Sequence, residues 1–242
     1  MVSMLTDKGI VRNHNEDYCL YYESDDFNIY VVCDGMGGHK AGEIASELTS
    51  KYVIQYINEN FLEEDSEEVL KNAIRKANWE VYNMAAENEA LSGMGTTITA
   101  CLELDDRVIV ANVGDSSSYA INNERIKKIT KDHSLVQELV DMGTITEEQA
   151  ITHPKKNIIT RAIGTHRHVD VDIFIVEKDV YNLFMLCTDG LTNEVNIDSI
   201  YEILSKEKNL EIACNKLVDK AKENGGRDNI TVLLFGGEKD DR

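Results

Sequence analysis

The chain has 242 residues, of which 42% are hydrophobic and one is proline, and its formal net charge is −19 at pH 7. This length and hydrophobic content suffice for one sizeable core, and no Pro-rich or Ser/Gly-rich linker divides the chain, so we expect a single domain over residues 1–242. The acidic balance argues against nucleic acid and anionic membranes as partners, because both repel negative charge.

The cellular compartment is predicted from three further features. No apolar run approaches the roughly 20 residues that a membrane helix needs, and residues 1–7 lack the basic start and apolar stretch of a secretory leader. The cysteines, at positions 19, 33, 101, 187 and 214, form no C-x-x-C pair and stand in apolar or mixed stretches. An odd number of cysteines in strand-like segments fits reduced thiols, so we expect a cytoplasmic protein.

The first third of the chain predicts strands followed by two helices. Residues 3–11 predict an edge strand and a loop, and the segments 18–22 and 29–33 predict two more strands because apolar and aromatic residues dominate them. Apolar residues then recur at spacings of three and four from Ala41 to Phe61, and again from Val69 to Ala85. This period is typical of amphipathic helices.

Four short strands are predicted next, at 96–104, 107–113, 118–121 and 125–129. Short turns separate these apolar runs, which indicates an antiparallel meander.

The segment from about 133 to 165 is polar and helical. Two Ser/Thr-x-x-Gln capping boxes, at 134–137 and 146–149, each predict the start of a short helix, and Gly143 can end the first one. A helical insert between strands is typical of a flap beside a functional site, although an inert surface insertion is equally compatible with these facts.

The last third of the chain predicts strands at 169–176, 183–187 and 230–235 and helices at 197–204 and 210–222. Helices that lie outside mainly antiparallel sheets predict an α+β layered sandwich rather than an alternating parallel fold.

Acidic residues stand at the ends of several predicted strands. Asp34, Asp115 and Asp189 each follow an apolar run and adjoin a glycine, Asp228 precedes the last strand, and Asp17 adjoins an early one. If these strands end at the same rim, several carboxylates meet in one cleft and repel each other strongly. A cation would have to lie between them, and oxygen donors favour Mg²⁺ or Mn²⁺ over zinc.

Two such ions a few Å apart would hold a phosphate group and turn a bridging water into hydroxide. Arg12, in a polar cluster before the second predicted strand, could bind two oxygens of that phosphate at once.

Seven short motifs occur in order along the chain: Arg12-x-x-Asn15-Glu16-Asp17, Asp34-Gly35-Met36-Gly37-Gly38-His39, Gly95-Thr96-Thr97, Asn112-Val113-Gly114-Asp115-Ser116, Asn157-x-x-Thr160-Arg161-x-x-Gly164, Thr188-Asp189-Gly190-Leu191 and Gly226-x-Asp228-Asn229-Ile230-Thr231. Each motif alone is a weak signal, but seven in order are a strong one. Taken together, they resemble the motifs of the metal-dependent protein serine/threonine phosphatases, the type 2C protein phosphatases, and the bacterial form is the most similar. The resemblance runs from about Thr6 to Phe235.

The resemblance implies a four-layer α/β/β/α sandwich, in which two central antiparallel sheets are flanked by helix pairs. It also implies one catalytic domain with a flap at about 133–165 that screens substrates. The implied reaction is hydrolysis of phosphoserine and phosphothreonine in proteins, by in-line attack of a hydroxide that bridges two divalent metals. The implied partners are phosphorylated proteins, among them a cognate Ser/Thr kinase and its substrates, and we expect a monomer.

Three metal positions follow from the resemblance, for Mn²⁺ or Mg²⁺, with two ions in the core of the site. Asp34, Asp189 and Asp228 would hold the first ion. Asp17, Asp34 and the Gly35 carbonyl would hold the second. Asp115 and Asp189 would hold a third.

Four more residues receive roles from the resemblance. Glu16 would reach the second metal through water, and Asn229 would support the metal ligands from outside the ligand set. Arg12 would bind the substrate phosphate. His39 is the candidate acid for the leaving group by its position, and metal-bound water is the alternative.

The chain departs from the family pattern at two positions. Ser117 stands where many members have arginine, and Thr188 stands where serine is frequent. Neither position supplies a metal ligand, so hydrolysis is still expected. Arg161 is expected to be structural. The alternative function is a catalytically degenerate module that binds phosphoproteins; it predicts the loss of a metal carboxylate, and no carboxylate is lost.

Overall fold

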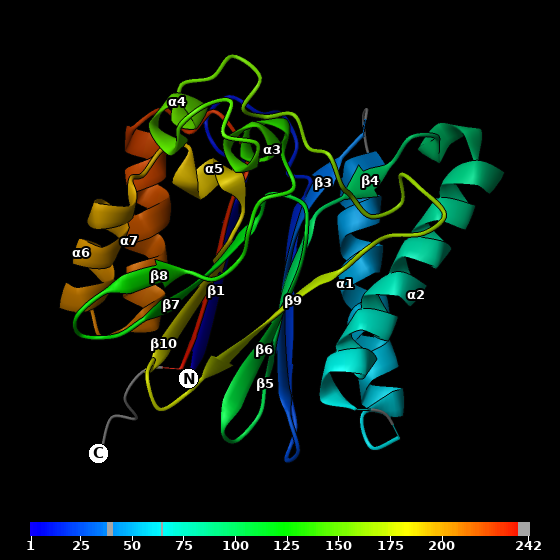
Figure 1. The fold of residues 1–242 in the computed structure, drawn as a ribbon, viewed down its shortest axis with the longest axis horizontal. Helices are drawn as coiled ribbons and strands as arrows, with labels where there is room; N and C mark the ends of the chain where they lie inside the picture. The colour runs from blue at the N-terminus through cyan, green and yellow to red at the C-terminus, as the bar shows by residue number, and fades with distance from the viewer. Residues whose placement is uncertain (38–40, 64, 237–242) are drawn as a thin grey trace.

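Two antiparallel β-sheets stack face to face at the centre of the structure, a computed structural model that describes residues 1–37, 41–63 and 65–236 (Figure 1). The first sheet has the strand order β1 (Val2–Asp7), β11 (Ile230–Gly236), β10 (Leu183–Cys187), β7 (Ser117–Ile121) and β8 (Ile126–Lys128). The second has the order β2 (Asp17–Glu23), β3 (Asn28–Met36), β5 (Ile98–Glu103), β6 (Arg107–Val113) and β9 (Asp172–Glu177). A short strand, β4 (Gly95–Thr96), pairs with the end of β3.

Helices cover the outer face of each sheet. The pair α1 (Ala41–Asn60) and α2 (Ser66–Glu87) packs on the second sheet, and α6 (Ile197–Lys206) and α7 (Leu210–Glu223) pack on the first (Figure 1). Three short helices, α3 (Leu135–Asp141), α4 (Glu147–Ile151) and α5 (Asp189–Thr192), lie at one end of the sandwich, and a single 3₁₀ turn, η1 (Glu89–Leu91), follows α2. The predicted α/β/β/α sandwich is confirmed.

The long apolar runs of the central strands reflect burial on both faces. Along β3, Ile29, Val31 and Cys33 pack toward α1 and α2, while Tyr30 and Val32 pack between the two sheets. Successive side chains of a strand point to opposite faces, so a strand between two cores needs apolar residues at every position. The helices therefore hide one face of each sheet and the partner sheet hides the other.

Three stacked aromatic rings join the two sheets. Phe235 on β11 lies between Tyr30 on β3 and Phe184 on β10, with ring centroids 3.9 Å and 5.1 Å away. All three residues are 2% exposed or less. The packing of the two sheets depends on this stack, because it spans the layer between them.

The predicted strand at 96–104 is interrupted at Thr97, which separates β4 from β5. The Thr97 backbone N–H donates to the carbonyl of Asp34 at 2.9 Å, and its hydroxyl accepts from the Asp34 N–H at 2.9 Å. The interruption at Thr97 therefore satisfies both backbone groups of Asp34, its N–H and its carbonyl.

Other boundaries differ by a few residues. The last strand of the second sheet begins at Asp172 rather than at 169, and Arg161 donates to the Asp170 carbonyl just before it. Of the two expected capping boxes, the one at 146–149 is complete, whereas the Gln137 side chain donates to Asp141 and leaves the box at 134–137 half made. The sequence patterns did not predict α5 or η1.

Within the described ranges, no helix is long and apolar enough to cross a membrane.

We predict that Phe235→Ala lowers the free energy of unfolding by about 3–5 kcal/mol, since it removes the central ring of the stack and leaves a cavity. Urea unfolding followed by circular dichroism measures this change. Met142→Ala is the control, because Met142 is 75% exposed. Equal stability of the two variants would contradict the role given to the stack.

Candidate functional site

The sheet topology brings the predicted carboxylates to one end of the sandwich. Asp17 on β2 and Asp34 on β3 stand directly opposite each other in the strand register. Asp115 follows the end of β6, Asp189 follows the end of β10, and Asp228 precedes β11. This end also carries α3, α4 and α5 (Figure 1).

A pocket of about 270 Å³ opens at this end of the molecule. It is lined by most of the residues that sequence reasoning had singled out, namely Arg12, Glu16, Asp34, Gly35, Asp115, Asp189, Asp228 and Asn229. Asp17 lies behind them and is buried. His39, the candidate acid, lies outside the described residues.

Two threonine hydroxyls hold the Asp17 carboxylate. Thr188 and Thr231 both donate to Oδ2, at 2.8 Å and 2.7 Å, whereas the buried Oδ1 has no hydrogen-bond partner. Thr188 departs from the family pattern, but its hydroxyl makes the bond that a serine could also make. Burial, together with the charges of Asp189 and Asp228 and opposed by these two bonds, raises the pKa of Asp17 to about 7.

The other carboxylates are also difficult to ionise together. Burial, followed by the negative charge of the neighbouring aspartates, raises the pKa of Asp34 well above its usual range, that of Asp115 to about 8 and that of Asp189 to about 6. One oxygen of Asp115 and one of Glu16 are buried and unpartnered, like Oδ1 of Asp17. Buried polar atoms normally have partners, so these three oxygens suit a site that binds a positively charged group.

The donor set fits a hard divalent cation, because it consists of carboxylate and carbonyl oxygens. As the side chains lie, however, no three His, Cys, Asp or Glu residues of the described chain converge on one ion position. Two of the donors have protein partners instead: Arg12 binds Asp228 at 2.7 Å, and the Asn193 side chain donates to Asp189 at 2.9 Å.

Asn229 fixes the loop that carries Arg12 and Glu16. Its side-chain oxygen accepts from the Glu16 backbone N–H at 2.8 Å, and its amide nitrogen donates to the carbonyls of Lys8 and His14 at 3.0 and 2.8 Å. The Asn229 side chain therefore bonds to both ends of the loop formed by residues 8–16.

Gly35 allows the start of α1 to approach β3 closely. A Cβ atom on Gly35 would lie 2.3 Å from the Gly42 carbonyl oxygen and 2.4 Å from that of Glu16. Only glycine fits here, and its backbone is left open to the pocket.

The insert at 133–165 supplies one wall of the pocket through Asn157 and Ile159. Sequence reasoning placed Asn157 in a motif without giving it a role, and it missed Ile159 altogether. Arg161, expected to be structural, pairs with Asp172 at 2.6 Å and does not line the pocket.

A second hollow, of about 300 Å³, lies between the insert and α5 and shares Asp115, Asn157 and Asp189 with the first.

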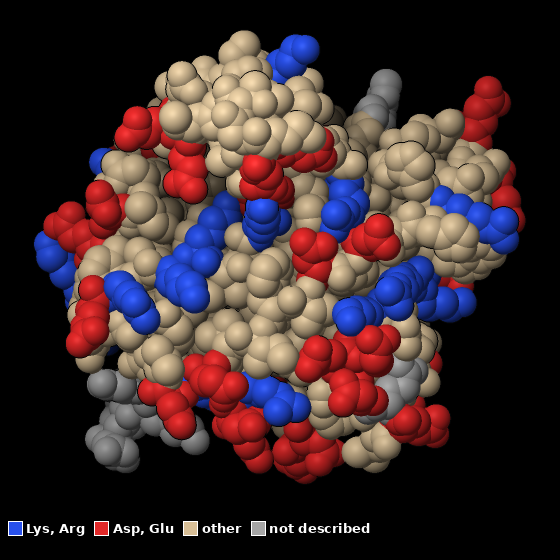
Figure 2. Space-filling view, viewed as in Figure 1, with Lys and Arg blue, Asp and Glu red and all other residues tan. Residues whose placement is uncertain are grey.

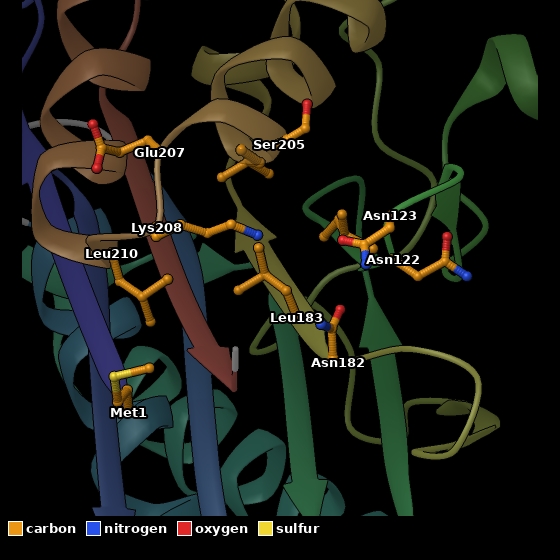
Figure 3. Close-up of a pocket in the computed structure, with 11 residues that line it drawn as sticks. Met1, Asn122, Asn123, Asn182, Leu183, Ser205, Glu207, Lys208 and Leu210 are labelled. Carbon is orange, nitrogen blue, oxygen red and sulfur yellow. The ribbon is translucent and has the colours of Figure 1, made fainter. Parts of the chain in front are cut away.

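A third hollow, of about 100 Å³, lies where β10 begins, at the opposite end of that strand from Asp189. Figure 3 shows the Lys208 side chain extending into it near Leu183, while the Glu207 carboxylate points away. Glu207 is the one acidic residue among those that line it, and it pairs with Lys216 at 2.8 Å. This hollow lacks the donors for a metal.

Comparison with known proteins gives consistent matches. The family model for protein phosphatase 2C matches residues 10–221. The chain is 41% identical over 233 residues to the serine/threonine phosphatase stp of Listeria monocytogenes, which covers 95% of this chain and 92% of that protein. It is 35% identical to protein phosphatase PhpP of Streptococcus pneumoniae, over 99% and 98% of the two chains. The crystal structure of serine/threonine phosphatase Stp1 from Staphylococcus aureus superposes with a TM-score of 0.89 at 40% identity, over 98% and 95% of the chains.

We predict that Asp115→Asn stabilises the metal-free protein and that the gain grows as the pH rises from 5 to 8. The unfolded chain releases this proton near pH 4 and the folded chain near pH 8, so the unfolded state binds fewer protons between these values and stability falls as the pH rises. Asparagine removes this dependence and should add at least about 1 kcal/mol at pH 8.

Urea unfolding in EDTA at both pH values measures this effect. Asp179→Asn is the control, because Asp179 is exposed. An Asp115→Asn protein that is no more stable than the wild type at pH 8 would show that the charge of Asp115 is already compensated.

Proposed function

The chain belongs to the protein phosphatase 2C family and is a serine/threonine protein phosphatase, and we propose that the pocket between Arg12 and Asp189 is its catalytic site. The unpartnered carboxylate oxygens around this pocket are the observation that carries the proposal. Folding has gathered acidic groups that repel each other, and a site for divalent cations explains why.

The family depends on metal ions, and we propose Mn²⁺ or Mg²⁺ here. Asp34, Asp189 and Asp228 would hold the first ion; Asp17, Asp34 and the Gly35 carbonyl would hold the second, with Glu16 acting through water; and Asp115 with Asp189 would hold a third. When bound, such ions supply an activated water for attack on phosphorus and neutralise charge on the phosphate. The open backbone at Gly35 and the free oxygens of Asp17 and Asp115 support this assignment.

Arg12 is suited to bind the phosphate of the substrate. Its side chain is 50% exposed at the mouth of the pocket, and Asn229 fixes the loop that carries it. A guanidinium presents donors in a planar fork that matches two phosphate oxygens. The phosphoryl group would therefore lie between Arg12 and the carboxylates.

The flap at about 133–165 would contact the polypeptide around the phosphorylated residue, because Asn157 and Ile159 form a wall of the pocket. The proton for the leaving Ser or Thr oxygen would come from His39 or from water. Loss of turnover in His39→Ala at neutral pH, with recovery at lower pH, would identify the histidine.

Phosphorylated Ser/Thr proteins are the substrates, and we propose that they include a cognate kinase and its targets. We also propose a cytoplasmic monomer that forms one domain over residues 1–242. All five cysteines are buried free thiols, which supports a reducing compartment. The alternative, a degenerate module that binds phosphoproteins, is not favoured, because none of the expected carboxylates is lost: four line the pocket, and Asp17 is buried opposite Asp34 in the strand register.

We predict release of phosphate from a phosphothreonine peptide that requires Mn²⁺ or Mg²⁺ and is abolished by EDTA. In the same assay, Asp34→Asn and Asp228→Asn should each lose at least about 10²-fold in kcat, since each removes a charged metal ligand. Mn²⁺ titration calorimetry should show weaker binding by both variants.

Asp179→Asn is the control for the loss of one negative charge, because this residue is exposed. Rates near the wild-type value in either ligand variant would contradict the metal assignment, and an inactive wild-type protein at millimolar Mn²⁺ would contradict the catalytic site.

We predict that Arg12→Gln raises KM for the phosphothreonine peptide about 10- to 100-fold, because charged hydrogen bonds to the phosphate are lost. Initial-rate kinetics with saturating Mn²⁺ measure the change. Arg227→Gln is the matched control: its side chain is 74% exposed, one residue from Asp228. Equal KM values for the two variants would exclude Arg12 as the phosphate ligand.

A further inference from the structure

A chain of polar contacts runs from the insert to one of the proposed metal ligands. Lys156 Nζ donates to Oδ1 of Asn193 at 2.7 Å, and Nδ2 of Asn193 donates to Oδ2 of Asp189 at 2.9 Å. Lys156 belongs to the insert, whereas Asn193 is the C-terminal cap of α5, the helix that begins at Asp189. The positive charge of Lys156 also lowers the pKa of Asp189, although burial outweighs it.

The position of Asn193 suits this linkage for a local reason. Residues four apart on a helix are neighbours on one face, so the side chain of Asn193 meets that of Asp189, and its backbone N–H also donates to the Asp189 carbonyl at 2.8 Å. A side-chain amide is both an acceptor and a donor. Its oxygen can therefore accept a hydrogen bond from the Lys156 ammonium while its nitrogen donates one to the Asp189 carboxylate.

The ammonium and the carboxylate favour the same orientation of the Asn193 amide. The carboxylate repels the amide oxygen and accepts from the amide nitrogen, and the ammonium donates to the oxygen. With Lys156 in place, Oδ1 faces the cation and Nδ2 faces Asp189. The orientation of Asp189 is thereby tied to the position of the insert.

Backbone hydrogen bonds between residues 133–135 and 158–160 hold the base of the insert, whereas its tip, α3 and α4, has few buried contacts. Neither α3 nor α4 buries a residue, and Met142 and Ile151 are 75% and 70% exposed. Figure 2 shows that the surface around these two helices, at the top of the view, carries few charged side chains. Lys131 Nζ pairs with Oδ2 of Asp141, the last residue of α3, at 2.7 Å. Because Lys131 lies only four residues before α3, this ion pair does not connect the insert to α5. A segment with few buried contacts opens easily, so one polar tether changes its position measurably.

The tether acts at the part of the insert that reaches the pocket. Lys156 directly precedes Asn157, and Asn157 and Ile159 both line the proposed catalytic pocket. Lys156 and Asn193 also line the neighbouring hollow between α4 and α5.

We propose that Lys156 and Asn193 are positioning residues: together they latch the flap onto Asp189, so that one linkage sets both the pocket wall at Asn157 and the orientation of a metal ligand. This inference rests on the proposed catalytic site, and it adds that substrate contacts on the flap are coupled to the metal centre. Neither residue touches the reacting atoms.

Amide hydrogen exchange in the metal-free protein tests the latch without any catalysis. The N–H groups of Lys156 and Ile158 donate to the carbonyls of His153 and Lys155, so their exchange reports opening of this segment. Lys156→Met should speed their exchange about fivefold, the effect of losing one hydrogen bond of typical net strength. Asn193→Leu should do the same, and the double variant should exchange no faster than either single variant.

Lys155→Met is the matched control, a neighbouring exposed lysine whose replacement should leave exchange as in the wild type. Unchanged exchange in Lys156→Met, or additive effects in the double variant, would overturn the latch. Circular dichroism melting of each variant identifies a general loss of fold, which would raise exchange throughout the sheets and not only in the flap.

Two further measurements separate positioning from a merely structural role. Asn193→Leu should weaken Mn²⁺ binding at least about tenfold in calorimetry, because partners of metal ligands have effects of this size.

Lys156→Met should raise KM for a phosphothreonine peptide about threefold and change KM for p-nitrophenyl phosphate less, since only the peptide extends along the flap. Unchanged Mn²⁺ affinity in Asn193→Leu, or equal KM changes for the two substrates, would overturn the positioning role. Inactivity of the wild type would refute the proposed function and leave the exchange result standing.

Discussion

Repulsion among carboxylates at the end of the sandwich is the constraint on which the site depends. Asp17 and Asp34 are opposite residues of neighbouring strands, and Asp189 lies close enough to both to raise their pKa values. One buried oxygen each of Glu16, Asp17 and Asp115 has no hydrogen-bond partner. The fold holds these charges together because they stand on elements that are fixed by the core, and a divalent cation would remove the cost.

The two stacked sheets make this arrangement possible. Strands of both sheets end at the same rim, so acids that are far apart in the sequence share one pocket. The stacked rings of Tyr30, Phe184 and Phe235 lie in the apolar layer between the sheets and join them. Around this rigid base lie less firmly held parts. Asn229 closes the loop of Arg12, and the insert above α5 is joined to Asp189 through Asn193. The strands thus carry the carboxylates, and the insert is joined to them through polar contacts.

The sequence could predict the layers and the acidic cluster, because both are local patterns. Apolar runs before Asp-Gly predicted that Asp34 and Asp189 meet in one cleft, and both line the pocket, although β3 continues past Asp34 to Met36. The period of α1 and α2 is regular. It could not predict the break at Thr97, which depends on a hydrogen bond to a residue 63 positions away. Nor could it show the Thr188 and Thr231 hydroxyls on Asp17, or the partners of Asn193 and Arg161, since a side chain's partner is set by tertiary contacts and not by its neighbours in sequence.

Anomalous diffraction from crystals grown with Mn²⁺ tests the central claim most directly, because it locates the ions without reference to activity. The account predicts two strong peaks within bonding distance of Asp34, one of them also bonded to Asp189 and Asp228 and the other to Asp17. Peaks confined to other surfaces, with these carboxylates bound to protein partners at saturating Mn²⁺, would contradict it.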